Sequence, residues 1–212
     1  MENLKKPILS VILPCYNTEK YIGKTLESLE AQTMQDFEMV FVNDGSTDHT
    51  LDILNSVKEK YPSRVIVVSK ENEGLSKTRN VGLEYATGEF VIFLDSDDYI
   101  DNDYFEVLTK AAVENNSDMV LSGQHKVDEE GNIIASIDYP VDKYSEYSLR
   151  RLNMHGKLYR LSFLNEHNIR FANGKLNEDN PFNNRLQCCF INCFNRNERI
   201  GILNGARVRI SG

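Results

Sequence analysis

The chain has 212 residues, of which 41% are hydrophobic, so it is long enough to bury the core of one well-packed domain. Its 32 acidic and 24 basic residues give a formal net charge of −8 without any Lys/Arg-rich block, which excludes the electrostatic footprint of a nucleic-acid binder. The longest apolar runs are far shorter than the roughly 18 to 20 residues of a membrane span, and the start MENLKKP has no signal-peptide apolar region, so we expect a cytoplasmic protein.

The first half of the chain alternates short apolar runs, rich in β-branched residues, with patterns of helical periodicity. Continuous apolar strands separated by helices of this length indicate a parallel sheet covered on both faces. Thr18 and Ser46 stand where the N-caps of the first two helices are expected. The predicted strands are residues 8–14, 37–44, 64–69 and 89–95, and the predicted helices are residues 19–32, 50–61 and 76–86.

After Asp98 the alternation weakens. A helix is predicted over residues 103–114, a strand over 118–123, a hairpin over 127–134 and a short helix over 162–168. No internal repeat, low-complexity tract or Pro/Ser-rich linker interrupts the sequence, so we expect one continuous unit of α/β class.

The four cysteines form neither a disulfide framework nor a paired CxxC zinc pattern. Cys15 stands alone, whereas Cys188, Cys189 and Cys193 are close together. Reduced, partly buried thiols are the favoured interpretation, and metal binding by the late cluster is the alternative.

Three of the predicted strands end in polar residues, with the sequences PCYN, NDGS and DSDD. In an open parallel sheet, ligands bind beyond the carboxyl ends of the strands, so we expect the chemistry at that edge. DSDD contains three carboxylates, Asp95, Asp97 and Asp98. One interpretation is that they cap a solvated turn before the next helix. The other is that they present oxygen ligands to Mg²⁺ or Mn²⁺, which would hold the phosphates of a substrate.

The other strand ends also allow two interpretations each. Asp44 is a turn residue or an acceptor of hydrogen bonds from a nucleobase or ribose, and Tyr16 packs on the sheet edge or stacks on a base. Arg79 and Asn80 near a helix N-terminus suit a diphosphate, with a solvated surface as the alternative. The chain has no GxGxxG after its first strand and no GxxxxGK[ST], which argues against a dinucleotide fold and a P-loop.

Four stretches, in this order and spacing, resemble the N-terminal half of family 2 glycosyltransferases of bacterial type. They are VILPCYNTEKYIGKTLESLEAQT, FVNDGSTDHT, NEGLSKTRNVGLEYATGEF and VIFLDSDDY. The resemblance implies a GT-A fold, that is, a Rossmann-like, mostly parallel sheet with helices on both faces and a mixed C-terminal acceptor half. It also implies an inverting, hexosyltransferase-type reaction with a nucleotide-sugar, commonly a UDP-sugar.

The resemblance also implies roles for individual residues. Pro14 and Tyr16 would begin the nucleobase pocket, and Asp44 would contact uracil. Arg79 and Asn80 would belong to the diphosphate surroundings. Within the DxD motif, Asp95 would lie on the ribose side, Asp97 would bind Mn²⁺ or Mg²⁺, and Asp98 would be a neighbouring ligand.

Further along, HGKLYRLSFLNEHNIRF followed by LNEDNPF is similar to the acceptor half of many bacterial members. By that resemblance Asp179 is the general base, with Glu178 as the second candidate. From the residues alone, both carboxylates could equally stabilise the N-terminus of a helix beginning at Pro181.

The resemblance divides the chain into a nucleotide-sugar-binding half, residues 1–123, and an acceptor-binding half, residues 124–212, within one continuous domain. It ends after about residue 186, so we expect the acceptor half to be incomplete or atypical at its C-terminus. The implied acceptor is a glycan or a lipid-linked glycan in polysaccharide or surface-glycan assembly, with peripheral association at the inner membrane face. The alternatives are a nucleotide-sugar-binding remnant without transfer and a sugar-phosphate nucleotidyltransferase.

Overall fold

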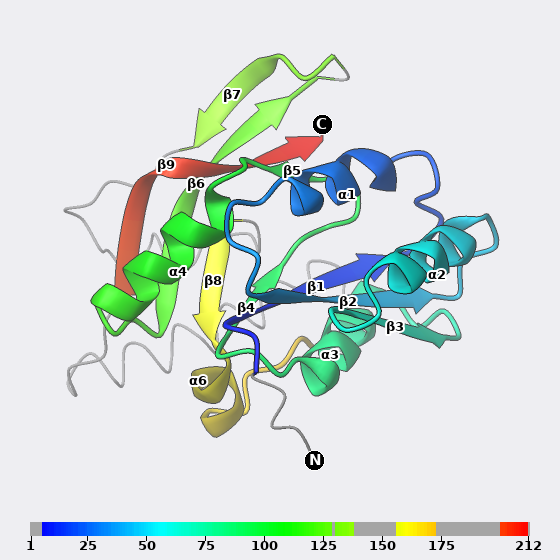
Figure 1. Cartoon of the computed structure of the whole chain (residues 1–212), viewed down its shortest axis with the longest axis horizontal. Coiled ribbons are helices and arrows are strands. Elements are labelled where there is room, and N and C mark those ends of the chain that lie inside the picture. The colour runs from blue at the N-terminus through cyan, green and yellow to red at the C-terminus, as the bar shows by residue number, and fades with distance from the viewer. Residues whose placement is uncertain (1–5, 129, 138–155, 173–199, 212) are drawn as a thin grey trace.

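The computed structural model describes residues 6–128, 130–137, 156–172 and 200–211, and these form one nine-stranded sheet with helices packed on it (Figure 1). The strand order is β3-β2-β1-β4-β8-β6-β9-β5, and β7 pairs with β6. None of the described helices is long and apolar enough to cross a membrane.

The first half of the sheet is parallel, as the sequence predicts. β1 pairs with β2 and β4, and β2 pairs with β3, all in the parallel direction. Each crossover between these strands contains one helix. The strands are β1 (Leu9–Cys15), β2 (Phe37–Asp44), β3 (Val65–Lys70) and β4 (Phe90–Phe93), and the helices are α1 (Ile22–Glu30), α2 (Thr50–Lys60) and α3 (Leu75–Tyr85).

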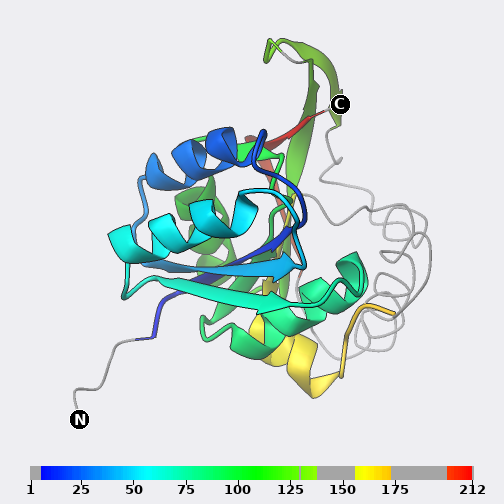
Figure 2. The same cartoon turned by 90° about the vertical axis from the view of Figure 1, so that its right-hand side faces the viewer.

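Alternate residues of the strands point to opposite faces, and each face has its own core. On one face, Leu13 of β1 and Phe41 of β2 belong to the same buried cluster as Ile22 of α1 and Leu54 of α2. On the other face, Ile12 belongs to a cluster with side chains of α3 and α6. Figure 2 shows α1 and α2 on one side of the sheet and α3 and α6 on the other, which confirms the predicted coverage of both faces.

The second half of the sheet is mixed, also as predicted. β8 (Lys157–Arg160) lies antiparallel between β4 and β6 (Met119–Val127), and β9 (Ile200–Ser211) runs parallel to β6. β7 (Ile133–Ile137) forms the predicted hairpin with β6, whereas the sequence did not predict β9 or β5 (Tyr99–Ile100). The remaining helices, α4 (Tyr104–Glu114) and α6 (Leu161–Glu166), match predicted ones to within two residues.

Both predicted N-caps are wrong. α1 begins at Ile22, three residues later than predicted, and α2 begins at Thr50 as predicted. Their N-cap residues are Tyr21 and His49, and neither makes a side-chain capping bond. The Thr18 carbonyl accepts the backbone N–H groups of Tyr21 and Ile22, so Thr18 begins a turn before the helix. Ser46 instead accepts a hydrogen bond from the backbone of Asn17, in the loop that follows β1.

The turn between α3 and β4 packs tightly on the start of β1. The Ser10 hydroxyl donates to Glu38 at 2.6 Å and accepts from the Gly88 N–H at 2.8 Å. Glu38 also accepts the backbone N–H of Thr87 at 2.7 Å. A Cβ atom at Gly88 would lie 2.7 Å from the backbone nitrogen of Ser10, which cannot move without disturbing β1.

We therefore expect Gly88→Ala to lower the free energy of unfolding by about 1 to 3 kcal/mol through overpacking, with roughly 1 kcal/mol more from the displaced hydrogen bond. Urea unfolding followed by circular dichroism measures this. Gly23→Ala is the matched control, because a Cβ there has no atom within 4 Å and an alanine favours helix. Equal urea midpoints for Gly88→Ala and the unmodified chain would contradict the prediction.

Candidate functional site

A cavity of about 550 Å³ lies beyond the carboxyl ends of β1, β2 and β4. Five of the residues predicted from the sequence line it: Pro14, Tyr16, Asp44, Asp95 and Asp97. The other lining residues are Asn17, Thr18, Tyr21, Asn72, Gly74, Leu75, Thr78 and Ser96. The edge of the sheet predicted to carry the chemistry is therefore hollowed.

Three of the lining residues are large apolar side chains that remain exposed. Tyr16 is 50% exposed, Tyr21 59% and Leu75 39%. Large exposed apolar groups gathered around a concave surface are typical of ligand-binding grooves. The cavity thus combines apolar walls with carboxylates at its base.

The loop after β1 is held by the loop after β2. Asn17 has a positive φ of 52°, and its side chain accepts the backbone N–H of Thr47 at 2.8 Å. The backbone N–H of Thr18 donates to the Thr50 hydroxyl at 2.8 Å. These bonds join residues about 30 positions apart, so they hold one wall of the cavity in place.

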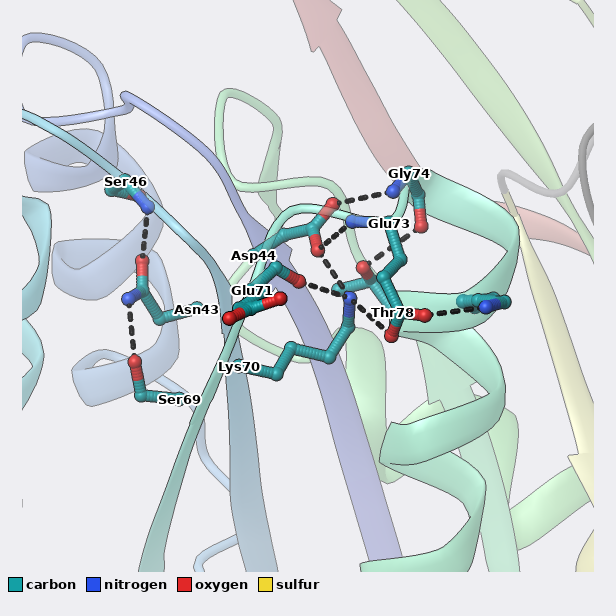
Figure 3. A network of polar contacts seen from close by, with 10 residues as sticks. Asn43, Asp44, Ser46, Ser69, Lys70, Glu71, Glu73, Gly74 and Thr78 are labelled. Carbon is teal, nitrogen blue, oxygen red and sulfur yellow. Dashed lines mark hydrogen bonds and ion pairs between the residues drawn. The ribbon is translucent and has the colours of Figure 1, made fainter.

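Asp44, the last residue of β2, is the centre of a polar network (Figure 3). Its Oδ1 accepts a hydrogen bond from Lys70 Nζ and another from the Glu73 N–H at 2.9 Å. Its Oδ2 accepts the Gly74 N–H at 2.9 Å. Burial alone would raise the pKa of the Asp44 carboxyl, but these hydrogen bonds and the charge of Lys70 outweigh burial and lower it, so Asp44 is ionised.

Gly45 allows the connection between β3 and α3 to approach Asp44. Its φ is +69°, and a Cβ there would lie 2.8 Å from the backbone nitrogen of Asn72. Only glycine fits this backbone conformation together with this approach. Asn72 thereby lines the cavity directly above the end of β2.

The three carboxylates of the DSDD turn differ in exposure and in whether they line the cavity. Asp97 is exposed and lines the cavity, and Asp95 lines it while forming an ion pair with Arg79 at 3.0 Å. Asp98 is only 1% exposed and is absent from the cavity lining. The Thr25 hydroxyl of α1 lies 2.9 and 2.7 Å from the carbonyl oxygens of Ser96 and Asp98, which fixes the turn.

Arg79 and Asn80 both contact Phe171. Arg79 is 2% exposed and its guanidinium lies 5.3 Å from the centre of the Phe171 ring. The Asn80 side chain donates to the Phe171 carbonyl at 3.0 Å and accepts the Phe171 N–H at 2.9 Å. Neither residue belongs to the described lining of the cavity. Arg79 is linked to the cavity by its ion pair with Asp95.

Several other residues that the sequence singles out are not part of the described cavity. Glu178 and Asp179 lie outside the described residues, as do Cys188, Cys189 and Cys193. Within the described ranges no group of three or more His, Cys, Asp or Glu residues is arranged to hold a metal. Cys15 is buried, which raises the pKa of its thiol to about 12 and makes it a poor nucleophile.

Sequence reasoning missed Lys70, Asn72, Leu75 and Thr78. The sequence shows only that Lys70 follows an apolar run, whereas its register with Asp44 on the neighbouring strand comes from the structure. Thr78 and Leu75 belong to the first turns of α3, and Thr78 lines the cavity because that helix begins beside Asp44.

The chain is similar to known bacterial glycosyltransferases. It is 34% identical over 195 residues to glycosyltransferase GlyA of Streptococcus pneumoniae, covering 84% of this chain and 28% of that protein. It is 34% identical over 181 residues to poly(ribitol-phosphate) beta-glucosyltransferase of Bacillus spizizenii, covering 82% of this chain and 28% of that protein. The chain spans 28% to 59% of the length of the first three curated relatives that it matches.

The fold is similar to that of a solved glycosyltransferase. The crystal structure of Staphylococcus aureus TarS residues 1–349 in complex with UDP-GlcNAc superposes with a TM-score of 0.78 at 32% identity, covering 96% of this chain and 58% of that chain. This similarity confirms the predicted GT-A type fold. Residues 10–178 match the family model described as Glycosyl transferase family 2. The chain therefore belongs to glycosyl transferase family 2.

Proposed function

We propose that this chain carries the nucleotide-sugar-binding and transfer site of an inverting glycosyltransferase. It moves a sugar from a UDP-sugar to a hydroxyl of a glycan or lipid-linked acceptor in polysaccharide or surface-glycan biosynthesis. The observation that carries the proposal is the cavity at the strand ends, which brings together Pro14, Tyr16, Asp44, Asp95 and Asp97. The likeness to TarS, which was crystallised with UDP-GlcNAc, supports it.

The charge of Asp44 supports uracil as the base of the nucleotide. An ionised carboxylate only accepts hydrogen bonds, so Asp44, which lines the cavity, would accept one from a base that presents an N–H donor. Uracil presents an N–H donor at its N3 position, whereas cytosine presents an acceptor there. Tyr16, exposed beside Asp44 in the cavity wall, would stack on the base.

The residues present fit a divalent cation held jointly with a substrate. Mg²⁺ is usually bound by one or two carboxylates plus substrate phosphates, and carboxylates suit Mn²⁺ as well. Asp97 and Asp95 both line the cavity and would hold it, while Asp98 is buried away from the lining. When bound, the ion would act as a Lewis acid on the departing diphosphate.

The transfer itself needs a base and an in-line arrangement. Asp179, or Glu178 as the second candidate, would take the proton from an acceptor hydroxyl. That oxygen would bond to the anomeric carbon, and the bond from this carbon to the diphosphate oxygen would break with its electron pair leaving on UDP. Attack from the opposite face inverts the configuration. Both carboxylates belong to the part of the chain that the structure does not describe.

Calorimetric titration of UDP and CDP tests the proposal. We expect UDP to bind in the presence of Mn²⁺ and to bind more weakly in EDTA. UDP should bind about 10 to 100 times more tightly than CDP, because CDP lacks the hydrogen bond from the base to the charged Asp44 carboxylate. Release of UDP from UDP-sugars in the presence of acceptor then tests transfer. Absence of UDP binding under all conditions would overturn the proposal, and binding without transfer would favour a non-catalytic remnant.

A further inference from the structure

Lys70 lies behind the cavity, next to the carboxylate that forms its base. It is the last residue of β3, and the register of the parallel pair places it beside Asp44. Its side chain is 13% exposed, and its Nζ donates to Asp44 Oδ1 and, at 2.9 Å, to the carbonyl of Glu71 (Figure 3). Lys70 is not among the residues described as lining the cavity, so a ligand there would meet Asp44 and not Lys70.

The contacts of Lys70 determine which side of the carboxylate remains open. Oδ1 receives both the ammonium of Lys70 and the N–H of Glu73, whereas Oδ2 receives the N–H of Gly74. The Thr78 hydroxyl also bonds to the carboxyl and lowers its pKa. Each carboxylate oxygen can accept about two hydrogen bonds. Lys70 and Glu73 together fill Oδ1, so a ligand would meet the carboxylate at Oδ2.

Lys70 is also the cation in direct contact with Asp44. The other charged groups in this network are Glu73, whose Oε2 lies 3.5 Å from Lys70 Nζ, and Lys77, which pairs with Glu73 Oε1. Glu73 and Lys77 are each 42% exposed, so solvent screens them more than it screens Lys70 and Asp44.

We propose that Lys70 is a positioning residue for base selection, which holds the Asp44 carboxylate at the cavity so that uracil is chosen over cytosine. The inference rests on the proposed function, because Asp44 must contact the base. Lys70 touches no part of the substrate. It acts by holding the Asp44 carboxylate in place as a hydrogen-bond acceptor.

The charge state of Asp44 gives this role a pH signature. Burial raises the pKa of Asp44, and the hydrogen bond and charge of Lys70 are among the effects that lower it below its ordinary value. Without Lys70, burial is opposed by fewer groups and the pKa rises. A protonated Asp44 can donate to cytosine N3 and accepts less well from uracil N3–H, so selectivity is lost as the pH falls through the raised pKa.

The experiment measures the ratio of UDP to CDP affinity by calorimetry at pH 5.5 and pH 8 in Mn²⁺. We expect the unmodified chain to give the same ratio at both values. Lys70→Met should lower the ratio more at pH 5.5 than at pH 8, because the pKa of Asp44 rises when the charge and the hydrogen bond of Lys70 are removed. Lys70→Arg should restore the pH-independent ratio, because it returns the charge to Asp44.

Two further variants keep the test decisive. Lys77→Met is the matched control, because it removes a nearby lysine that contacts Glu73 but not Asp44, and its ratio should follow the unmodified chain. If Lys70→Met does not fold, Lys70→Gln removes the charge while retaining a hydrogen-bond donor. A ratio in folded Lys70 variants that matches the unmodified chain at both pH values overturns this inference alone. Failure of the unmodified chain to bind UDP overturns the proposed function as well.

Discussion

Replacing Asp97 by asparagine is expected to lower sugar transfer at least about 100-fold, or roughly 2.7 kcal/mol in transition-state stabilisation. Asp97 is exposed and lines the cavity, and asparagine keeps its shape while removing its charge. In the proposed reaction this carboxylate would hold the cation where negative charge develops on the departing diphosphate. An exposed substitution of this kind should change the free energy of unfolding by no more than about 0.5 kcal/mol.

Steady-state release of UDP and calorimetric binding of UDP, each with Mn²⁺ and with EDTA, measure the effect. The matched control is Asp103→Asn, which removes an exposed carboxylate nearby that makes no capping bond to α4. Asp98→Asn provides the contrast. Asp98 is 1% exposed, so its change should lower the unfolding free energy by about 1 to 3 kcal/mol and spare the metal dependence of UDP binding.

The two variants show which of the two neighbouring carboxylates, Asp97 or Asp98, binds a cation. Unchanged metal-dependent binding and transfer in Asp97→Asn would exclude Asp97 as the ligand of a cation. A loss of metal dependence in Asp98→Asn, with its fold retained, would instead show that the buried carboxylate reaches the cation. The exposures of the two side chains favour Asp97.

The strands and helices of the first half were predictable because their signals are local. The apolar runs of β1 and β2 end abruptly at polar residues. Leu29 of α1 and Leu54 of α2 each belong to a series of apolar residues at helical spacing, and both are buried. The predicted cavity residues followed from the rule that parallel strands end at one edge. β9 was missed because its sequence, IGILNGARVRIS, contains two glycines and arginines that interrupt the apolar pattern.

The details of the site were less predictable because their partners are distant in the sequence. Asn17 and Thr18 are typical capping residues, but the loop after β2, about 30 residues later, takes their hydrogen bonds. Lys70 at the end of a strand looks like a solvated cation until its register with Asp44 is known. Asn80 and Phe171 are 91 residues apart, so no local pattern pairs them.

The second large effect is expected at Phe171, where truncation to alanine should lower the free energy of unfolding by about 3 to 5 kcal/mol. The ring is 3% exposed and packs edge-on against Phe93 with the ring centres 5.1 Å apart. The guanidinium of Arg79 lies 5.3 Å from its centre. In a chain of about 200 residues this loss corresponds to a fall in melting temperature of roughly 6 to 20 °C.

Thermal and urea unfolding measure the change, and Val113→Ala is the control, because Val113 is 53% exposed and its truncation should cost little. Phe171→Leu should recover part of the loss, since it refills most of the cavity. A melting temperature of Phe171→Ala within about 2 °C of the unmodified chain, which is less than about 1 kcal/mol, would contradict the prediction.

Phe171 also tests the prediction that residues 1–123 and 124–212 form one continuous domain. Its ring, together with the two hydrogen bonds between its backbone and the Asn80 side chain, fastens a segment of the second half to β4 and α3 of the first. β8 of the second half lies between β4 and β6, so the halves share one sheet. If they unfold as one unit, truncating Phe171 must shift a single transition seen by every probe. If they unfold separately, the truncation would split the transition, and the ion pair of Arg79 with Asp95 at the cavity would be lost before the rest of the sheet.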